Sequence, residues 1–110
     1  MATQPVQIVT TIDSKQSAEK LVSQLVEENL VACGQIDGPI RSIYRWQGVV
    51  EKAAEYRCIL KTDLRLIRQL EQRIRELHDY AVPEIVATDI VFATEDYLRW
   101  LDQQLLPEQE

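Results

Sequence analysis

The chain has 110 residues, a formal net charge of −6 at pH 7 and 45% hydrophobic residues. This length and composition predict one globular domain, residues 1–110, that needs neither disulfide nor metal to fold. The acidic balance excludes nucleic acid and anionic membranes as expected partners, because both attract clustered Lys and Arg. No apolar run approaches the roughly 20 residues of a membrane span, and residues 1–7 show no signal peptide. We therefore expect a cytoplasmic protein in which Cys33 and Cys58 stay reduced.

The N-terminal part predicts a strand, a helix and a second strand. Residues 7–12 alternate and are rich in β-branched side chains, which is typical of a strand. Asp13 or Ser14 can cap the helix that follows, which is predicted to end at 29–30. Its apolar residues recur at helical spacing, namely Ala18, Leu21, Val22, Leu25 and Val26. Residues 31–36 predict the second strand, which is broken by Asp-Gly-Pro at 37–39 and resumes at 41, with the Gly-Pro pair marking a bend or bulge.

Residues 42–62 predict a long hairpin that turns at Gln47 and Gly48. Each arm spans about ten residues, roughly 33 Å at the rise of a strand, whereas an ordinary strand has about five or six residues. A domain of this size has no use for such a length within itself. We therefore expect the hairpin to serve a neighbouring subunit, with Tyr44 and Trp46 as interface anchors.

The C-terminal part predicts a helix, a strand and a last helix. The helix is expected over 63–77, capped by Thr62 or Asp63. Residues 78–83 form a connector, because the residue before a proline avoids helical geometry. Residues 84–91 predict the last strand, and a third helix is expected from a cap at Thr94 to Pro107.

This order predicts an α+β fold of the ferredoxin-like, split βαβ type (βαββαβ plus a C-terminal helix). It is a four-stranded antiparallel sheet with two helices on one face. The strands are apolar on both faces, since the neighbouring residues Ile8 and Val9 point to opposite faces of the sheet, as do Ile59 and Leu60. A second face in water would be more polar. We therefore expect a homo-oligomer whose open sheet faces pack together, with Ile59 at the interface.

Short blocks spread along the chain carry a resemblance to a known family. They are Leu30-Val31-Ala32-Cys33, Ser42-Ile43-Tyr44 with Trp46 and Gly48, Glu51, Lys61-Thr62, His78 with Tyr80, Val82-Pro83-Glu84-Ile85, and Tyr97-Leu98 with Trp100. Together they resemble the CutA family of divalent-cation tolerance proteins over almost the whole chain. The resemblance implies a ferredoxin-like protomer in a tight homotrimer, a role in tolerance of copper and other divalent metals, and no cofactor needed for folding.

The candidate metal ligands are His78, the only histidine, and Cys33. Copper prefers thiolate, thioether or imidazole donors, so weak copper binding would use these two side chains. Family members proposed to hold copper have a cysteine ending the first strand and two consecutive histidines before the tyrosine. This chain has Thr10-Thr11 and Leu77-His78 there. Two alternatives stay open, that His78 ends the second helix and that Cys33 is a buried strand residue.

A second candidate site is a polar cluster at a subunit boundary, formed by Lys61, Tyr80 and Glu84 beside His78. It would be a ligand cleft, or instead a Lys61–Glu84 ion pair that fixes register with Tyr80 packed between. The family's fold and trimer resemble the PII signalling proteins, which bind small effectors between subunits. The rival function is therefore a PII-like regulatory or scaffold module with a small-molecule or protein partner. No catalytic signature is found, and only three glycines are present, so we do not expect an enzyme.

Overall fold

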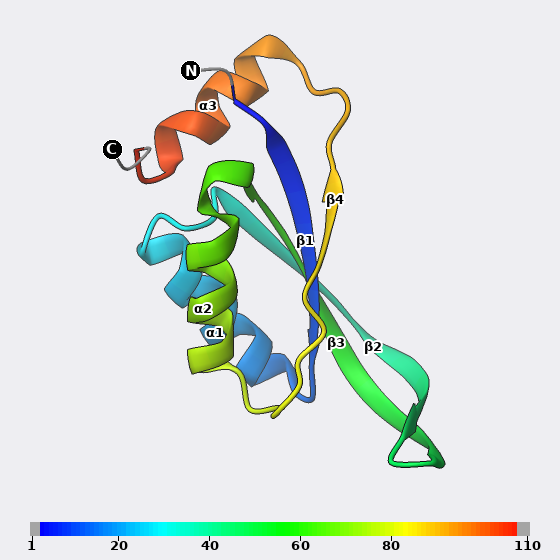
Figure 1. Cartoon of the computed structure of the whole chain (residues 1–110). Helices are drawn as coiled ribbons and strands as arrows, with labels where there is room; N and C mark the ends of the chain where they lie inside the picture. Colours follow the sequence, from blue (N-terminus) through cyan, green and yellow to red (C-terminus); the bar gives the residue numbers. More distant parts are fainter. Residues whose placement is uncertain (1–2, 108–110) are drawn as a thin grey trace.

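The computed structural model describes residues 3–107. The ends of the predicted domain, residues 1–2 and the acidic tail 108–110, lie outside the described residues. The elements, in chain order, are β1 (Pro5–Ile12), α1 (Lys15–Glu27), β2 (Cys33–Trp46), β3 (Val49–Asp63), a 3₁₀ turn (Leu64–Leu66), α2 (Ile67–Leu77), β4 (Val86–Asp89) and α3 (Glu95–Gln104). The strands form one antiparallel sheet in the order β2-β3-β1-β4, with α1 and α2 on one face (Figure 1). The ferredoxin-like prediction is confirmed. Within the described part, no helix combines the length and hydropathy needed to cross a membrane.

The core lies between the sheet and the two helices on its covered face. Ile8 and Leu60 are opposite each other on β1 and β3. They pack in one cluster with helix residues such as Leu25, Leu70 and Ile74, and all five are at most 1% exposed. A smaller cluster joins α3 to the end of the sheet and consists of Ala32, Leu66, Leu101 and Leu105. The predicted stripe of α1 marks its buried face at Ala18, Leu21, Val22 and Leu25, whereas Val26 is 38% exposed.

Side-chain hydrogen bonds from capping residues set where the helices begin. Ser14 is the N-cap of α1, and its hydroxyl accepts a hydrogen bond from the Ser17 amide at 3.1 Å. The predicted start of the second helix at Asp63 is wrong. Asp63 ends β3, and its carboxylate accepts from the Arg65 amide at 3.0 Å, which caps the 3₁₀ turn. The α2 helix therefore begins only at Ile67.

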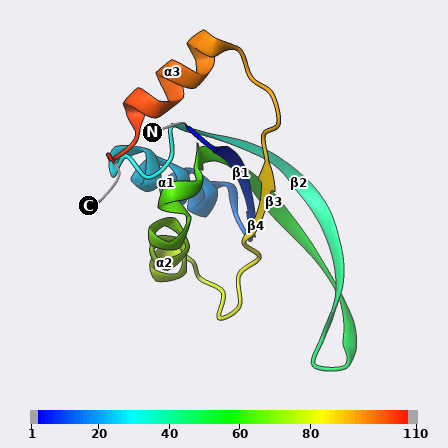
Figure 2. The same ribbon diagram turned by 45° about the horizontal axis from the view of Figure 1, so that its top comes forward.

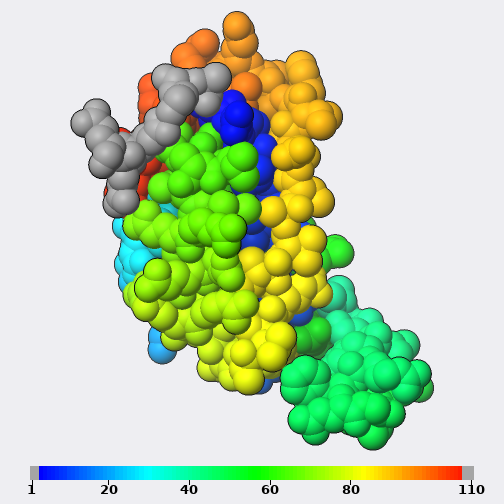
Figure 3. Space-filling model, viewed as in Figure 1, coloured from blue at the N-terminus to red at the C-terminus, as the bar shows by residue number. Residues whose placement is uncertain are grey.

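The hairpin is longer than the sequence predicts, with 14 residues in β2 and 15 in β3. Gln47 and Gly48 have φ of 51° and 83°, and two positive φ values make the tight turn that matches the twist of the strands. The bend or bulge predicted at Gly38-Pro39 is confirmed by a register shift between Asp37 and Ile40, although β2 continues through it as one strand. Such a bulge keeps the ladder while bending the strand. The hairpin tip projects well away from the body (Figures 2 and 3).

The open face of the sheet is less apolar than predicted. Strand pairing aligns Val9, Ile59 and Val86 in one apolar row. The rows on either side are polar, with Gln7 beside Lys61 and Thr11 beside Arg57. The last strand is also shorter than the predicted 84–91, since β4 covers only Val86–Asp89. An interface on this face would therefore combine an apolar stripe with polar contacts.

Candidate functional site

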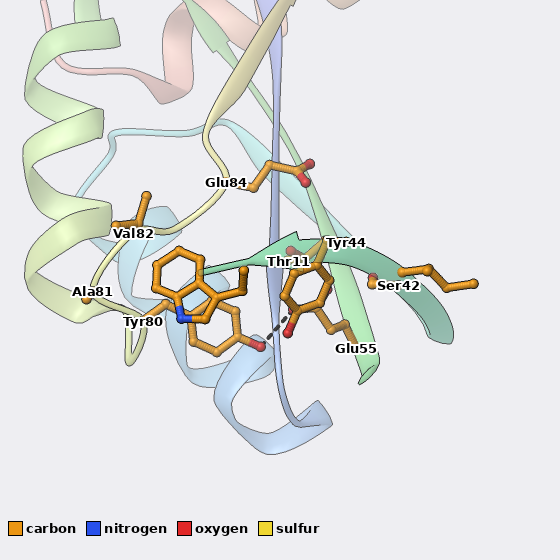
Figure 4. Close-up of a pocket in the computed structure, with 10 residues that line it drawn as sticks. Thr11, Ser42, Tyr44, Glu55, Tyr80, Ala81, Val82 and Glu84 are labelled. Atoms are coloured by element: carbon orange, nitrogen blue, oxygen red, sulfur yellow. Dashed lines mark hydrogen bonds between the residues drawn. The ribbon is translucent and has the colours of Figure 1, made fainter. Parts of the chain in front are cut away.

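A pocket of about 480 Å³ lies between the hairpin, β1 and the connector between α2 and β4 (Figure 4). Its walls come from three strands and the connector: Thr11, Ser42, Ile43, Tyr44, Trp46, Glu55, Tyr80, Ala81, Val82 and Glu84. The volume is in the range of pockets that hold small organic molecules. Tyr80 and Glu84 of the predicted cleft thus share one pocket with Tyr44 and Trp46 of the predicted interface.

Glu55 forms the buried polar end of this pocket. It lies on β3, on the face of Arg57 and Ile59, and is only 6% exposed. The Tyr80 hydroxyl donates to its Oε2 at 2.7 Å. Burial, followed by this carboxylate, raises the pKa of Tyr80, so the phenol stays protonated and donates. Sequence reasoning missed Glu55, because its place in the pocket depends on the contact with Tyr80, 25 residues away.

Tyr80 is held in place by His78, the C-cap of α2. The Tyr80 amide donates to His78 Nδ1 at 3.1 Å, which requires the ring proton on Nε2. Nε2 then donates to the Thr11 carbonyl at 2.8 Å, and the His78 and Tyr80 rings lie 4.7 Å apart. His78 is 9% exposed. Both ring nitrogens are engaged, so the imidazole ties the connector to β1 and offers no lone pair to a metal.

Cys33 lies elsewhere, at the start of β2. It is opposite Lys61, and its Sγ is 3.7 Å from the Tyr97 hydroxyl of α3. His78 contacts Thr11, which is opposite Arg57, four residues before Lys61 on β3. The two candidate metal ligands are therefore separated by roughly 13 Å along the sheet. No group of three or more His, Cys, Asp or Glu that could hold a metal is found within residues 3–107. A copper site built from Cys33 and His78 of one chain does not fit this geometry.

Lys61 is also separated from the pocket. Its Nζ donates to Gln35 Oε1 at 3.2 Å on the open face. The expected Lys61–Glu84 pair is not among the ion pairs of the described residues. Glu84 instead lies near Arg57, whose guanidinium contacts Asp37 at 2.8 Å. The hydrogen-bonded Asp37 raises the pKa of Arg57, and the charge of Glu84 adds to this effect.

Comparisons with known proteins give one consistent result. The family described as CutA1 divalent ion tolerance protein matches residues 6–104. The divalent-cation tolerance protein CutA of Pyrococcus horikoshii is 41% identical over 97 residues, 88% of this chain and 94% of that protein. "Protein CutA, chloroplastic" of Arabidopsis thaliana is 34% identical over 94 residues, 86% of this chain and 52% of that protein. The solved structure of the divalent cation tolerance protein of Thermus thermophilus superposes with a TM-score of 0.89 at 38% identity, over 92% of this chain and 98% of that one.

Proposed function

The chain belongs to the CutA1 family of divalent ion tolerance proteins, and from this premise we propose that it is a non-enzymatic homotrimer that acts in the response to divalent metal ions. The names of the Pyrococcus and Thermus proteins describe cation tolerance, which favours this role over a PII-like regulatory or scaffold module. The projecting hairpin is the observation that best supports a homotrimer.

The hairpin tip exposes more apolar surface than a monomer should. The exposed side chains, with their fractional exposure, are Ile43 (61%), Val49 (57%), Val50 (54%), Trp46 (47%) and Tyr44 (44%). Strand pairing puts Tyr44, Trp46 and Val49 on one face of the hairpin and Ile43 and Val50 on the other, so both faces of the tip carry exposed apolar side chains. Exposed apolar surface of this kind marks an interaction surface. In Figure 3 the hairpin protrudes from one end of the body, so a neighbouring copy is the simplest cover for the side chains that stay exposed.

The two edges of the sheet support a closed ring of copies. Among the described residues, the strand order leaves one edge of β2 and one edge of β4 without a neighbouring strand. Beyond β4, Val91 and Phe92 are 95% and 78% exposed. A head-to-tail contact between the β2 edge of one copy and the β4 edge of the next uses both edges, and such a contact makes a ring when the rotation closes. Three copies are the number that the family resemblance implies.

A shortened hairpin tests this assembly. Deleting residues 43–46 and 49–52 joins Ser42 to Ala53 through the same Gln47-Gly48 turn and keeps the pairing geometry, because Ser42 and Ala53 are already opposite each other. We expect a folded monomer by light scattering and circular dichroism. A shortened protein that still has the mass of the wild-type assembly would contradict the role of the hairpin.

For copper we propose weak binding without a dedicated site in one chain. The separation of Cys33 from His78 and the engaged imidazole support this proposal. Copper titration of the wild type should show an affinity no higher than that of an unfolded peptide control, and His78→Ala should leave it unchanged. Tight binding that disappears in His78→Ala would contradict the proposal. The cytoplasmic location stays a prediction, since the name of the Arabidopsis relative includes "chloroplastic".

A further inference from the structure

We infer that Glu55 is the buried half of an ion pair between subunits, and that the β2 arginines of the neighbouring copy, Arg41 and Arg45, supply the cation. The inference rests on the proposed homotrimer and deepens it, because it names side chains that hold one copy to the next. The pocket between the hairpin, β1 and the connector is then the receiving half of this contact, and the neighbouring copy closes it.

The first argument is that the carboxylate of Glu55 has no cationic partner in its own chain. Glu55 is 6% exposed and accepts one side-chain hydrogen bond, from the neutral Tyr80 hydroxyl. None of the ion pairs formed among residues 3–107 involves Glu55. A second carboxylate, Glu84, also lines the pocket, and none of the lining residues is basic. A buried charge is costly unless an opposite charge compensates it, so the cation has to come from another copy.

The second argument is that the hairpin separates its charges onto two faces. Side chains alternate along a strand, and the pairing of β2 with β3 puts Glu55 on one face and both Arg41 and Arg45 on the other. The two arginines are exposed, and neither belongs to an ion pair within the described part of the chain. Arg45 makes one long hydrogen bond, of 3.4 Å, to the Gly48 carbonyl. The arginines therefore point away from the Glu55 of their own copy and are available to that of the next.

The third argument is the position of the pocket beside the edge of the sheet. Within the described chain, β2 and β4 are the two edge strands. The part of the connector that lines the pocket lies between Tyr80 and Glu84, directly before β4 begins at Val86. A contact between the β2 edge of one copy and the β4 edge of the next therefore brings β2 side chains to the neighbour's pocket. Because a head-to-tail ring repeats the same contact, every Glu55 gains a partner in this way.

The fourth argument is that the pocket suits a guanidinium group. A guanidinium has five N–H donors in a planar fork and also stacks on aromatic rings. The pocket offers two carboxylates as acceptors, Glu55 and Glu84, and its aromatic walls are Tyr44 and Trp46. Figure 4 shows Tyr44 close to the hydrogen bond that Glu55 accepts. The two interface anchors thus also form the walls around the incoming arginine.

A double-mutant cycle on the assembly tests the pair. The assay is light scattering coupled to gel filtration over a dilution series, in urea adjusted so that the wild-type assembly is half dissociated. Glu55→Gln keeps an oxygen that accepts from Tyr80, so circular dichroism should show an intact fold, while the concentration for half dissociation rises at least about tenfold. Arg41→Gln combined with Arg45→Gln should raise it to a similar extent. In the Glu55→Gln background the arginine replacements should add less than about twofold, because their partner is already gone.

The matched control is Lys15→Gln combined with Lys20→Gln, which removes the same two positive charges from the exposed surface of α1. This control should dissociate like the wild type. Additive effects of Glu55→Gln and the arginine replacements, or a control that dissociates as readily as the arginine variant, would overturn the inference. A wild type that is monomeric at every concentration in the absence of urea would refute the trimer and the ion pair together, whereas a trimer with additive effects refutes only the ion pair.

Discussion

Replacing His78 by alanine should destabilise the protein rather than affect metal binding. The substitution removes the acceptor of the Tyr80 amide and the donor to the Thr11 carbonyl, which lie at 3.1 and 2.8 Å. Thr11 is 8% exposed and His78 is 9% exposed, so water replaces these bonds poorly. Each buried group left without a partner costs about 1–3 kcal/mol, and the lost ring contact with Tyr80 costs about 0.5–1.5 kcal/mol. We therefore expect the free energy of unfolding to fall by about 3 kcal/mol.

The assay is urea unfolding followed by circular dichroism at a fixed protein concentration, since assembly makes the midpoint concentration-dependent. Arg75→Ala is the matched control. Its side chain is 53% exposed near the end of the same helix, and its loss should change the free energy of unfolding by no more than about 0.5 kcal/mol. An unchanged urea midpoint in His78→Ala, together with a loss of copper affinity, would refute this reasoning and make the imidazole a metal ligand.

Three other changes test the hairpin and an ion pair. Trp46→Ala should weaken assembly by about 2 kcal/mol or more if this residue is an interface anchor, which light scattering during dilution would show as dissociation at a higher concentration; an unchanged dilution curve would contradict the anchor role. Gly48→Ala should lower the free energy of unfolding by about 1 kcal/mol, because an alanine at φ of 83° adopts an unfavourable backbone conformation. A Cβ at this position would have no described atom within 4 Å apart from its chain neighbours, so no steric clash adds to this cost. An unchanged thermal midpoint would argue against this turn. Hydrogen bonds from Arg73 and then Gln24 lower the pKa of Glu28 from 4.5 to about 2. The stability from this shift is fully present above pH 4.5 and is lost as pH falls towards 2, so the advantage of the wild type over Glu28→Gln should shrink in that interval; a difference independent of pH would contradict the ion pair.

Local signals predicted much of the fold. Helical spacing located the buried stripes of α1 and α2, and Ser14 and Thr94 occupy the predicted N-cap positions. The turn at Gln47 and Gly48 was evident because few residue pairs suit two positive φ values. These features depend on neighbours in the sequence, which is why the sequence alone was sufficient.

Features that depend on distant pairing could not be predicted in the same way. The Gly38-Pro39 pair marked a bend or bulge, but the continuation of β2 as one strand on both sides of it depends on the ladder with β3, which resumes at Ile40. Glu55 becomes a pocket residue only through a hydrogen bond to Tyr80, 25 residues away.

The strand register also decides which candidate metal ligands lie close together, and the sequence could identify these ligands only by residue type. Cys33 and His78 were natural partners by chemistry. The pairing of Cys33 with Lys61, and the bond of His78 to Thr11, put the two side chains at different positions along the sheet.

The molar mass of the unmodified protein in solution tests the central claim most directly. Light scattering coupled to gel filtration, repeated over a dilution series, should report about three times the chain mass of 12.7 kDa. This result is expected because the apolar hairpin and the open sheet edges need neighbouring copies to cover them. A compact particle of 12.7 kDa at every concentration would contradict the account.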